Sequence, residues 1–160
     1  MTINIREFRN ALGTFATGIN VITTISSDGV PLGMTVNSFT SVSLDPPLIL
    51  VCLDKKSAMT ESFVNGKGFG VNILHESQQS VSNDFAGKSE DRFATHGYST
   101  SERENPVLDG IVSFLDCQRE EVYEGGDHLI LVGRVMSFTY QSDADPLIYF
   151  NGAYHGLKGD

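Results

Sequence analysis

The stretch MTVNSFTSVSLDPP, from Met34 to Pro47, places small hydrogen-bonding side chains between apolar residues and stops at two consecutive prolines. Its polar members are Thr35, Asn37, Ser38, Thr40, Ser41 and Ser43. From this segment alone, the favoured interpretation is a hydroxyl-rich strand edge that runs into a turn. The alternative is a surface whose donors and acceptors bind a phosphate or the polar edge of a flat ring.

The segment before this stretch begins with a helix. Phe8, Ala11, Leu12 and Phe15 recur at helical spacing, and a glycine follows, so residues 4 to 17 are predicted to form an amphipathic helix. The period then changes to that of a sheet, with two β-rich runs around a Ser-Ser-Asp-Gly turn that predict a hairpin.

The segments after the stretch continue the sheet. The apolar run from Pro47 to Leu53 predicts a strand, Ser57 to Gly66 a short helix, and GFGVNIL a further strand. Residues 76 to 87 are polar and predicted helical, and residues 88 to 106 are predicted to form a surface loop.

The last third of the chain predicts more β-structure. Residues 110 to 141 alternate and turn at two glycines, which predicts a long hairpin, and residues 146 to 154 are expected to close the sheet. The prediction is a mainly β fold with a few helices, a β-barrel in a single domain over residues 1–160.

Composition excludes several classes of protein. With 160 residues, 40% of them apolar and 19% charged, the chain is typical of a globular domain. The N-terminus carries charges where a signal peptide needs an apolar run, and no window is long enough to span a membrane, so a soluble, cytoplasmic protein is expected. The formal charge of -9 disfavours nucleic-acid binding.

Neither the cysteines nor the histidines form a metal motif. Cys52 and Cys117 lie far apart without CxxC spacing, which predicts reduced thiols, and the four histidines show no ligand pattern. No metal is therefore predicted. Five of the eleven basic residues nevertheless fall between positions 55 and 92, so an anionic small molecule could have a local basic site.

Two further polar clusters carry candidate chemistry. Lys55, Lys56 and Ser57 precede a predicted helix N-terminus, where amide donors favour an anion, although an ordinary lysine turn with a cap explains them equally well. His128 follows a glycine turn at the start of a strand, in GGDH, and a histidine there is more often structural than functional.

Six motifs in order along the chain resemble one family. They are FRNALGTFATGINVITT, GMTVNSFTSVSLDPP, GVNIL, SNDFAG, GDH and DPLIYFNGAYHGL. Together they resemble the short-chain NAD(P)H:flavin oxidoreductases, the small reductase components of two-component flavin-dependent monooxygenases. The resemblance runs from Phe8 to about Leu157, and it outweighs the separate structural interpretations of the three clusters.

The resemblance implies a flavin-reductase-type FMN-binding split β-barrel, usually a homodimer, that binds FMN or FAD and takes hydride from NADH or NADPH. It implies that His128 is catalytic and lies beside the nicotinamide. The implied cofactor-binding residues are Thr35, Val36, Asn37, Ser38, Phe39, Ser41, Cys52, Leu53, Asp54, Lys55, Lys56, Ser57, Phe85, Ala86, Gly87, Lys88, His128 and Tyr154. The small polar residues of the opening stretch would let a polycyclic cofactor lie flat against the barrel.

The expected function is therefore an NAD(P)H-dependent flavin reductase that supplies reduced flavin to a partner monooxygenase. NADH is favoured over NADPH because no arginine cluster lies near the GDH turn. Two alternatives remain. One is a flavin-binding module or electron carrier without nicotinamide turnover, and the other is a structural or interaction subunit without a cofactor.

Overall fold

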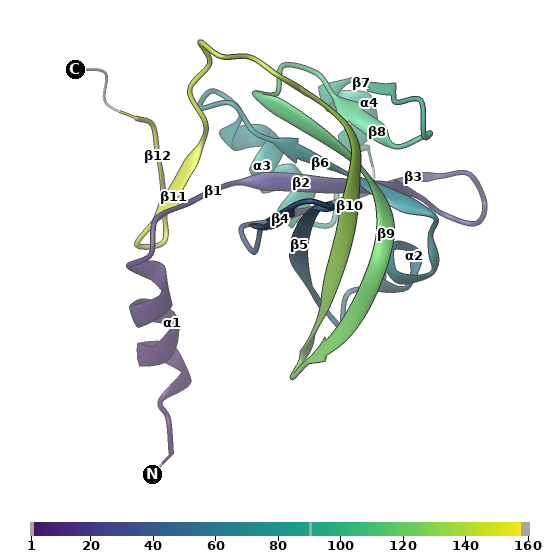
Figure 1. Cartoon of the computed structure of the whole chain (residues 1–160). Helices are drawn as coiled ribbons and strands as arrows, with labels where there is room; N and C mark the ends of the chain where they lie inside the picture. Colours follow the sequence, from purple (N-terminus) through teal and green to yellow (C-terminus); the bar gives the residue numbers. More distant parts are fainter. Residues whose placement is uncertain (1, 90, 158–160) are drawn as a thin grey trace.

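The computed structural model describes residues 2–89 and 91–157 (Figure 1). The helices in these residues are α1 (Ile5–Gly13), α2 (Thr60–Asn65), α3 (Gln79–Ala86) and α4 (Arg92–His96). The strands are β1 (Thr17–Gly18), β2 (Asn20–Ile25), β3 (Pro31–Val36), β4 (Thr40–Leu44), β5 (Pro47–Asp54), β6 (Gly68–Ile73), β7 (Tyr98–Thr100), β8 (Pro106–Leu108), β9 (Ser113–Gly125), β10 (His128–Tyr140), β11 (Ile148–Phe150) and β12 (Ala153–His155). The predicted mainly β fold with a few helices is confirmed.

One seven-stranded antiparallel sheet dominates the molecule, in the order β3-β2-β6-β9-β10-β5-β4. The stretch from Met34 to Pro47 contributes the end of β3 and all of β4, so its two halves lie in the two edge strands of the sheet. Residues 37–39 connect these two edge strands along the chain, but β3 and β4 do not pair with each other through backbone hydrogen bonds. The predicted barrel is therefore not closed by hydrogen bonds, and the split lies between β3 and β4.

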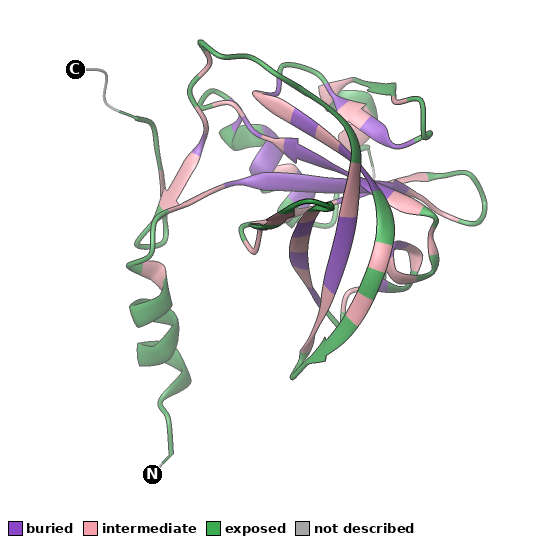
Figure 2. Cartoon of the chain, in the orientation of Figure 1, coloured by how far each residue is buried: buried purple, intermediate pink, exposed green. Residues whose placement is uncertain are grey.

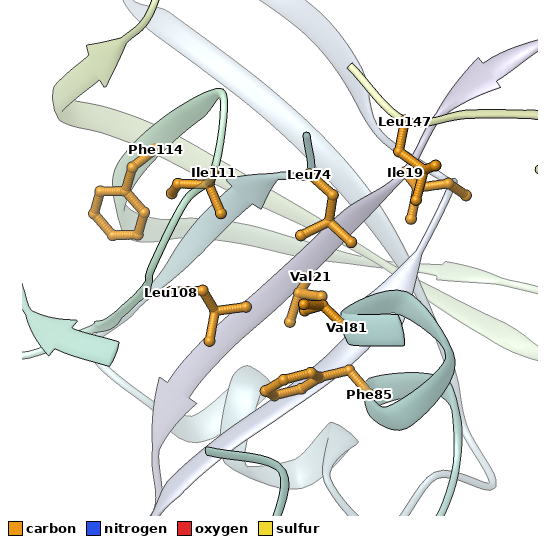
Figure 3. Packing of buried hydrophobic residues seen from close by; sticks show 9 residues of the cluster. All are labelled: Ile19, Val21, Leu74, Val81, Phe85, Leu108, Ile111, Phe114 and Leu147. Carbon is orange, nitrogen blue, oxygen red and sulfur yellow. The ribbon is translucent and has the colours of Figure 1, made fainter. Parts of the chain in front are cut away.

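Two hydrophobic clusters pack on the two faces of this sheet, because side chains alternate between faces along a strand. The inner cluster comprises Ile22, Ile49, Val51, Leu53, Phe63, Phe69, Val71, Cys117 and Leu131. The outer cluster comprises Ile19, Val21, Leu74, Val81, Phe85, Leu108, Ile111, Phe114 and Leu147 (Figure 3). The neighbours Val21 and Ile22 belong to different clusters, so each face of β2 is buried. Figure 2 accordingly colours β2 as buried.

The predicted N-terminal helix is present but ends earlier than expected. The Asn4 side chain caps α1 by accepting hydrogen bonds from the backbone N–H groups of Arg6 and Glu7 at 3.0 and 3.2 Å. The helix ends at Gly13, and Phe15 beyond it is 76% exposed. None of the residues of α1 is buried, and the helix extends away from the sheet (Figures 1 and 2).

The prediction of a surface loop over residues 88–106 is wrong for nine of the nineteen residues of that segment. It contains α4 and β7 and leads into β8, which pairs with β7. The Phe93 ring packs edge-to-face on Phe85 with a centroid distance of 5.0 Å, and on Tyr98 at 5.1 Å. Elements of three to five residues are too short to produce an apolar period, which explains the error. Glu90 of this segment lies outside the described residues, as do Met1 and residues 158–160 of the predicted domain.

The prediction that residues 146–154 close the main sheet is also wrong. β11 pairs with β1 and β12 in a separate three-stranded sheet. Just before β11, Leu147 donates to the carbonyl of Leu74 at 2.9 Å and accepts from the N–H of Ile19 at 3.1 Å, which joins this sheet to the end of β6 and the start of β2. The C-terminal strands therefore pair with β1 near the N-terminus, and they lie close to α1 in Figure 1.

Candidate functional site

The connection between β3 and β4 is held by its own hydroxyl groups. Ser38 Oγ accepts a hydrogen bond from the backbone N–H of Cys52 and donates one to the carbonyl of Cys52, both at 3.0 Å. A hydroxyl can do both because it is a donor and an acceptor. Thr35 donates to the carbonyl of Ser82 in α3 at 2.7 Å. Part of the polar character of the opening stretch is thus structural, and Asn37 and Ser41 remain exposed.

The second predicted cluster lies where β5 ends beside the start of β10. The register of these strands pairs Asp54 with His128 and Cys52 with Ile130. Leu53, between the two β5 positions, belongs to the inner cluster, so the side chains of Cys52 and Asp54 lie on the outer face of the sheet. His128 shares that face as the cross-strand neighbour of Asp54.

The His128 ring is oriented by the residue before it. Nδ1 of His128 lies 2.7 Å from Oδ1 of Asp127, and donation from this nitrogen holds the pKa of the Asp127 carboxyl below its ordinary value. Asp127 is therefore ionised at neutral pH. Because Nδ1 is occupied, the histidine presents Nε2 away from the turn, with its side chain 42% exposed. Asp127 is a residue that the sequence interpretation missed, although it stands next to the histidine in GDH.

The two lysines of this cluster differ in their partners. The Lys55 ammonium contacts the Glu124 carboxylate and donates to the carbonyl of Gly126 at 2.7 Å, so its charge is largely neutralised. Lys56 has no ion pair among the described side chains, and its charge contributes to lowering the pKa of Asp127. Ser57 does not cap α2 as expected, because the cap position is Met59 and Ser57 Oγ accepts from the N–H of Met59 at 3.3 Å. We call the residues Asp54, Lys55, Lys56, Asp127 and His128 the hairpin-end region.

A separate set of residues gathers around α3, where the third predicted cluster, that of His128, takes no part; Ser82 and Asn83 in it were not predicted. The Tyr154 hydroxyl lies 2.8 Å from Oγ of Ser82 and donates to Oδ1 of Asn83 at 3.0 Å. Ser82 also accepts from Thr35 through its carbonyl, so α3 is joined both to β3 and to β12. Thr35 pairs in register with Val21 of the outer cluster, which places it on the outer face as well. We call the residues Thr35, Ser82, Asn83, Phe85 and Tyr154 the α3 region.

Several predicted residues have side chains that are committed to packing. Phe85 is 1% exposed and extends from α3 into the outer cluster (Figure 3), and Leu53 is fully buried. Val36 and Phe39 pack against the inner cluster. The buried side chains of Phe85 and Leu53 leave only their backbone for a cofactor, Val36 and Phe39 are partly buried, and Lys88, beyond the end of α3, is exposed.

Arg92 was not predicted, and it contacts the turn that follows α3. Its Nη1 donates to the carbonyls of Gly33, Phe85 and Gly87 at 3.3, 3.4 and 3.4 Å. Its guanidinium lies over the Phe85 ring, 5.7 Å from the centroid. No local pattern indicates this role, because Arg92 lies in a segment without apolar periodicity.

Other features of the described residues lie apart from these regions. A pocket of about 660 Å³ lies between α2, the end of β2 and residues 103–105, and none of the predicted site residues lines it. Cys52 and Cys117 are free thiols, and burial raises the pKa of Cys117 to about 12 and that of Cys52 in the same direction. In residues 2–89 and 91–157 no group of three or more His, Cys, Asp or Glu residues could hold a metal ion. Within the same ranges no helix combines the length and apolarity needed to cross a membrane.

Comparison with known proteins bears on these regions. The family described as "Flavin reductase like domain" matches residues 12–158. The reductase component of a flavin-dependent trigonelline monooxygenase from Acinetobacter baylyi is 49% identical over 150 residues, which cover 94% of this chain and 48% of that protein. The HsaB reductase subunit of a flavin-dependent monooxygenase from Rhodococcus jostii is 40% identical over 158 residues, which cover 99% of this chain and 80% of that protein.

Solved structures match over the same length. An NADH:FAD oxidoreductase from Streptomyces globisporus, solved in complex with NAD and FAD fragments, superposes with a TM-score of 0.93 at 34% identity, covering 100% of this chain and 98% of the other. The styrene monooxygenase flavin reductase from Pseudomonas putida gives a TM-score of 0.86 at 35% identity, covering 96% and 99%. These neighbours have the predicted flavin-reductase fold.

The match to the Acinetobacter protein, like that to a Rhizobium meliloti flavin reductase, spans only about half of the relative's length, 48% in each case. The residues matched by the family, 12–158, include the whole main sheet and both candidate regions. With that match and the 40% identity to the HsaB subunit, the chain belongs to the flavin reductase like domain family.

Proposed function

We propose that this protein is a flavin reductase, which transfers a hydride from NADH to FMN or FAD and supplies reduced flavin to a partner monooxygenase. The observation that carries the proposal is that predicted residues from distant segments share the outer face of one curved sheet. Thr35 lies there on β3, Cys52 and Asp54 on β5, and His128 on β10. The names of the relatives support the same activity.

The exposed donors fit a flavin better than an apolar ligand. Asn37, Lys56 and Lys88 are exposed, and they supply amide and ammonium groups for the polar edge of a ring system and for a phosphate. Ser41 is also exposed, but it pairs in register with Ile49 of the inner cluster and so lies on the other face of the sheet. The buried side chains beneath them keep the backbone fixed. Bulky apolar side chains at these positions would prevent a flat cofactor from lying on the sheet.

Bound flavin supplies the hydride acceptor of the reaction, and NADH supplies the hydride and leaves as NAD⁺. The residues of this chain have to orient two flat molecules and exclude water, because hydride transfer needs close, aligned atoms and no nucleophile. In the proposed arrangement the hairpin-end region orients the nicotinamide through His128 and meets the flavin phosphate through Lys56, and the α3 region holds the flavin ring. The raised thiol pKa values mean that both cysteines stay protonated at neutral pH, which agrees with a reaction that uses no thiolate.

The test is NADH oxidation by the purified protein, followed by absorbance with FMN, FAD, riboflavin or no flavin added. The proposal predicts turnover that depends on added or bound flavin, with NADH used better than NADPH. Flavin binding without NADH oxidation would instead indicate an electron carrier. A protein that binds no flavin would contradict the proposal altogether.

We further propose a homodimer, on the basis of exposed apolar side chains. In α1, Ile5 is 60%, Phe8 49% and Leu12 59% exposed, although their spacing is that of a packed helix face. On the main sheet, Leu44 is 95% and Phe138 63% exposed. Strand β5 and the first half of β10 do not supply this surface, because they pair with each other and their Val51, Leu53 and Leu131 side chains are fully buried within the chain. Light scattering at micromolar concentration should give twice 17.4 kDa, and a 17.4 kDa species alone would contradict the dimer.

A further inference from the structure

Arg92 connects two chain segments that the proposed function assigns to the flavin. One is β3, where Gly33 O accepts from Arg92 Nη1 only two residues before Thr35. The other is the turn that follows α3, where Phe85 O and Gly87 O accept from the same nitrogen. An Nη1 group has two hydrogens, so three acceptors at 3.3 to 3.4 Å share them, and the position of the guanidinium depends on all three.

The surroundings of Arg92 fix its side chain in this position. The planar guanidinium lies 5.7 Å from the centroid of the Phe85 ring, and a positive charge is favourable at the C-terminal end of α3, where carbonyl groups lack helical partners. A second polar contact joins α4 to α3, since His96 Nε2 lies 2.7 Å from Asp84 Oδ2. Phe93 packs on Phe85 between these two contacts.

β3 approaches this assembly so closely that a side chain would not fit at Gly33. A Cβ atom added there would lie 2.8 and 2.9 Å from atoms of the Phe85 ring and 3.2 Å from Phe93. The distance between β3 and the turn after α3 is therefore set by direct packing and by the hydrogen bonds of Arg92. The predicted flavin residues lie next to these contacts, in Thr35 to Ser41 and in Ala86 to Lys88. The spacing between these two segments is therefore set by the same contacts.

We infer that Arg92 is a positioning residue for flavin, which sets the spacing between the Thr35–Ser41 segment and the Ala86–Lys88 turn without touching the cofactor. The inference rests on the proposed flavin reductase function. Loss of the guanidinium frees the turn from β3 and weakens flavin binding. The hairpin-end region, which is proposed to orient the nicotinamide, makes no contact with Arg92 and keeps its geometry.

The test compares Arg92→Ala, Arg92→Lys and the control Arg119→Ala by fluorescence titration with FMN, which gives the Kd without turnover, and by steady-state kinetics. The Kd for FMN should change in each variant by the same factor as the KM for FMN. Arg119 is a matched control because its Nε donates to a single backbone carbonyl, that of Gly66 at 3.3 Å, beside the pocket near α2. For Arg92→Ala we expect the KM for FMN to rise about tenfold, as the loss of charge-assisted hydrogen bonds implies, with the KM for NADH unchanged. Arg92→Lys keeps the charge but not the planar group, and we expect a rise of about threefold. Arg119→Ala should leave both KM values as in the wild type.

The outcomes separate this inference from the proposed function. If the wild-type protein does not oxidise NADH with flavin, the proposed function fails, and the positioning role of Arg92, which rests on it, is overturned with it. If the wild type is active and Arg92→Ala has an unchanged KM for FMN, or equal rises for FMN and NADH, the positioning role of Arg92 is wrong. If Arg92→Ala does not fold, Arg92→Lys decides, since a selective rise in the KM for FMN supports the inference and an unchanged value overturns it.

Discussion

The two candidate regions share the outer face of one sheet but are built in different ways. In the α3 region, Thr35, Ser82 and Tyr154 are linked by hydrogen bonds, and Phe85 beneath them is 1% exposed. In the hairpin-end region, Asp127 and His128 lie at the turn that joins β9 and β10, and the side chain of His128 is 42% exposed.

Under the proposed function, this difference corresponds to a division between holding the flavin, in the α3 region, and orienting the nicotinamide for hydride transfer, in the hairpin-end region. A cofactor that must lie flat needs a rigid platform, which buried and cross-linked side chains provide. A nicotinamide that enters and leaves in every cycle needs an accessible edge. Substitutions in the α3 region should therefore reduce stability and flavin affinity together, whereas those in the hairpin-end region should change binding or rate with little loss of stability.

The largest effect is expected for Phe85→Ala. Removing a fully buried ring that packs on Phe93 and against Gly33 should lower the free energy of unfolding by about 3–5 kcal/mol. Chemical denaturation measures this loss. Tyr123→Ala is the control, because Tyr123 is 54% exposed near the hairpin end and its loss should cost far less. Similar losses for the two variants would show that the α3 region is not the more rigid one.

A smaller effect on the same region is expected for Tyr154→Phe. The change removes only the hydroxyl that contacts Ser82 and Asn83, so the free energy of unfolding should fall by about 1 kcal/mol and the flavin Kd should rise. Tyr149→Phe is the matched control, because Tyr149 packs on Tyr154 at a centroid distance of 5.5 Å but its hydroxyl makes no hydrogen bond within the described part of the chain. A flavin Kd that does not change in Tyr154→Phe would restrict Tyr154 to a structural role.

The smallest effect is expected for the lysines of the hairpin-end region. Lys56→Ala should weaken FMN about threefold, with riboflavin unaffected, since an exposed ammonium gains little from one phosphate. Lys55→Ala should raise the Kd for FMN by a smaller factor, because Lys55 already contacts Glu124 and Gly126. Fluorescence titration gives both Kd values, and Lys67→Ala, beside the separate pocket, is the control. Equal losses for FMN and riboflavin would show that neither lysine meets the phosphate.

Much of the fold could be predicted from the sequence, because long elements leave periodic patterns. The hairpin of β9 and β10 has thirteen residues in each strand, and its alternation and its glycine turn were both recognised. The buried strand β5 was predicted from its apolar run. The segments whose prediction failed are short, such as α4 with five residues and β11 with three, and their place depends on partners far away in the chain.

The candidate site could be predicted only as a set of residues. The resemblance indicated Thr35, His128 and Tyr154, but not that Ser38 would bond to the backbone of Cys52. Nor could the sequence show that Phe85 is buried, because an apolar residue in a motif can face either a cofactor or the core. Roles that arise from packing, such as that of Arg92, leave no local pattern.

The measurement that tests the division most directly is anaerobic stopped-flow reduction of bound flavin by NADH in His128→Ala, with Tyr154→Phe beside it. The account predicts that His128→Ala keeps its flavin Kd and melting temperature but loses about ten- to a hundredfold in kcat/KM for NADH, equivalent to about 1.4–2.8 kcal/mol. Tyr154→Phe should show the opposite pattern, with weaker flavin binding and near-normal hydride transfer once flavin is saturating. If His128→Ala instead matches the wild type in hydride-transfer rate and NADH affinity, His128 only begins a strand, and the nicotinamide must lie elsewhere, near Tyr149 and Tyr154.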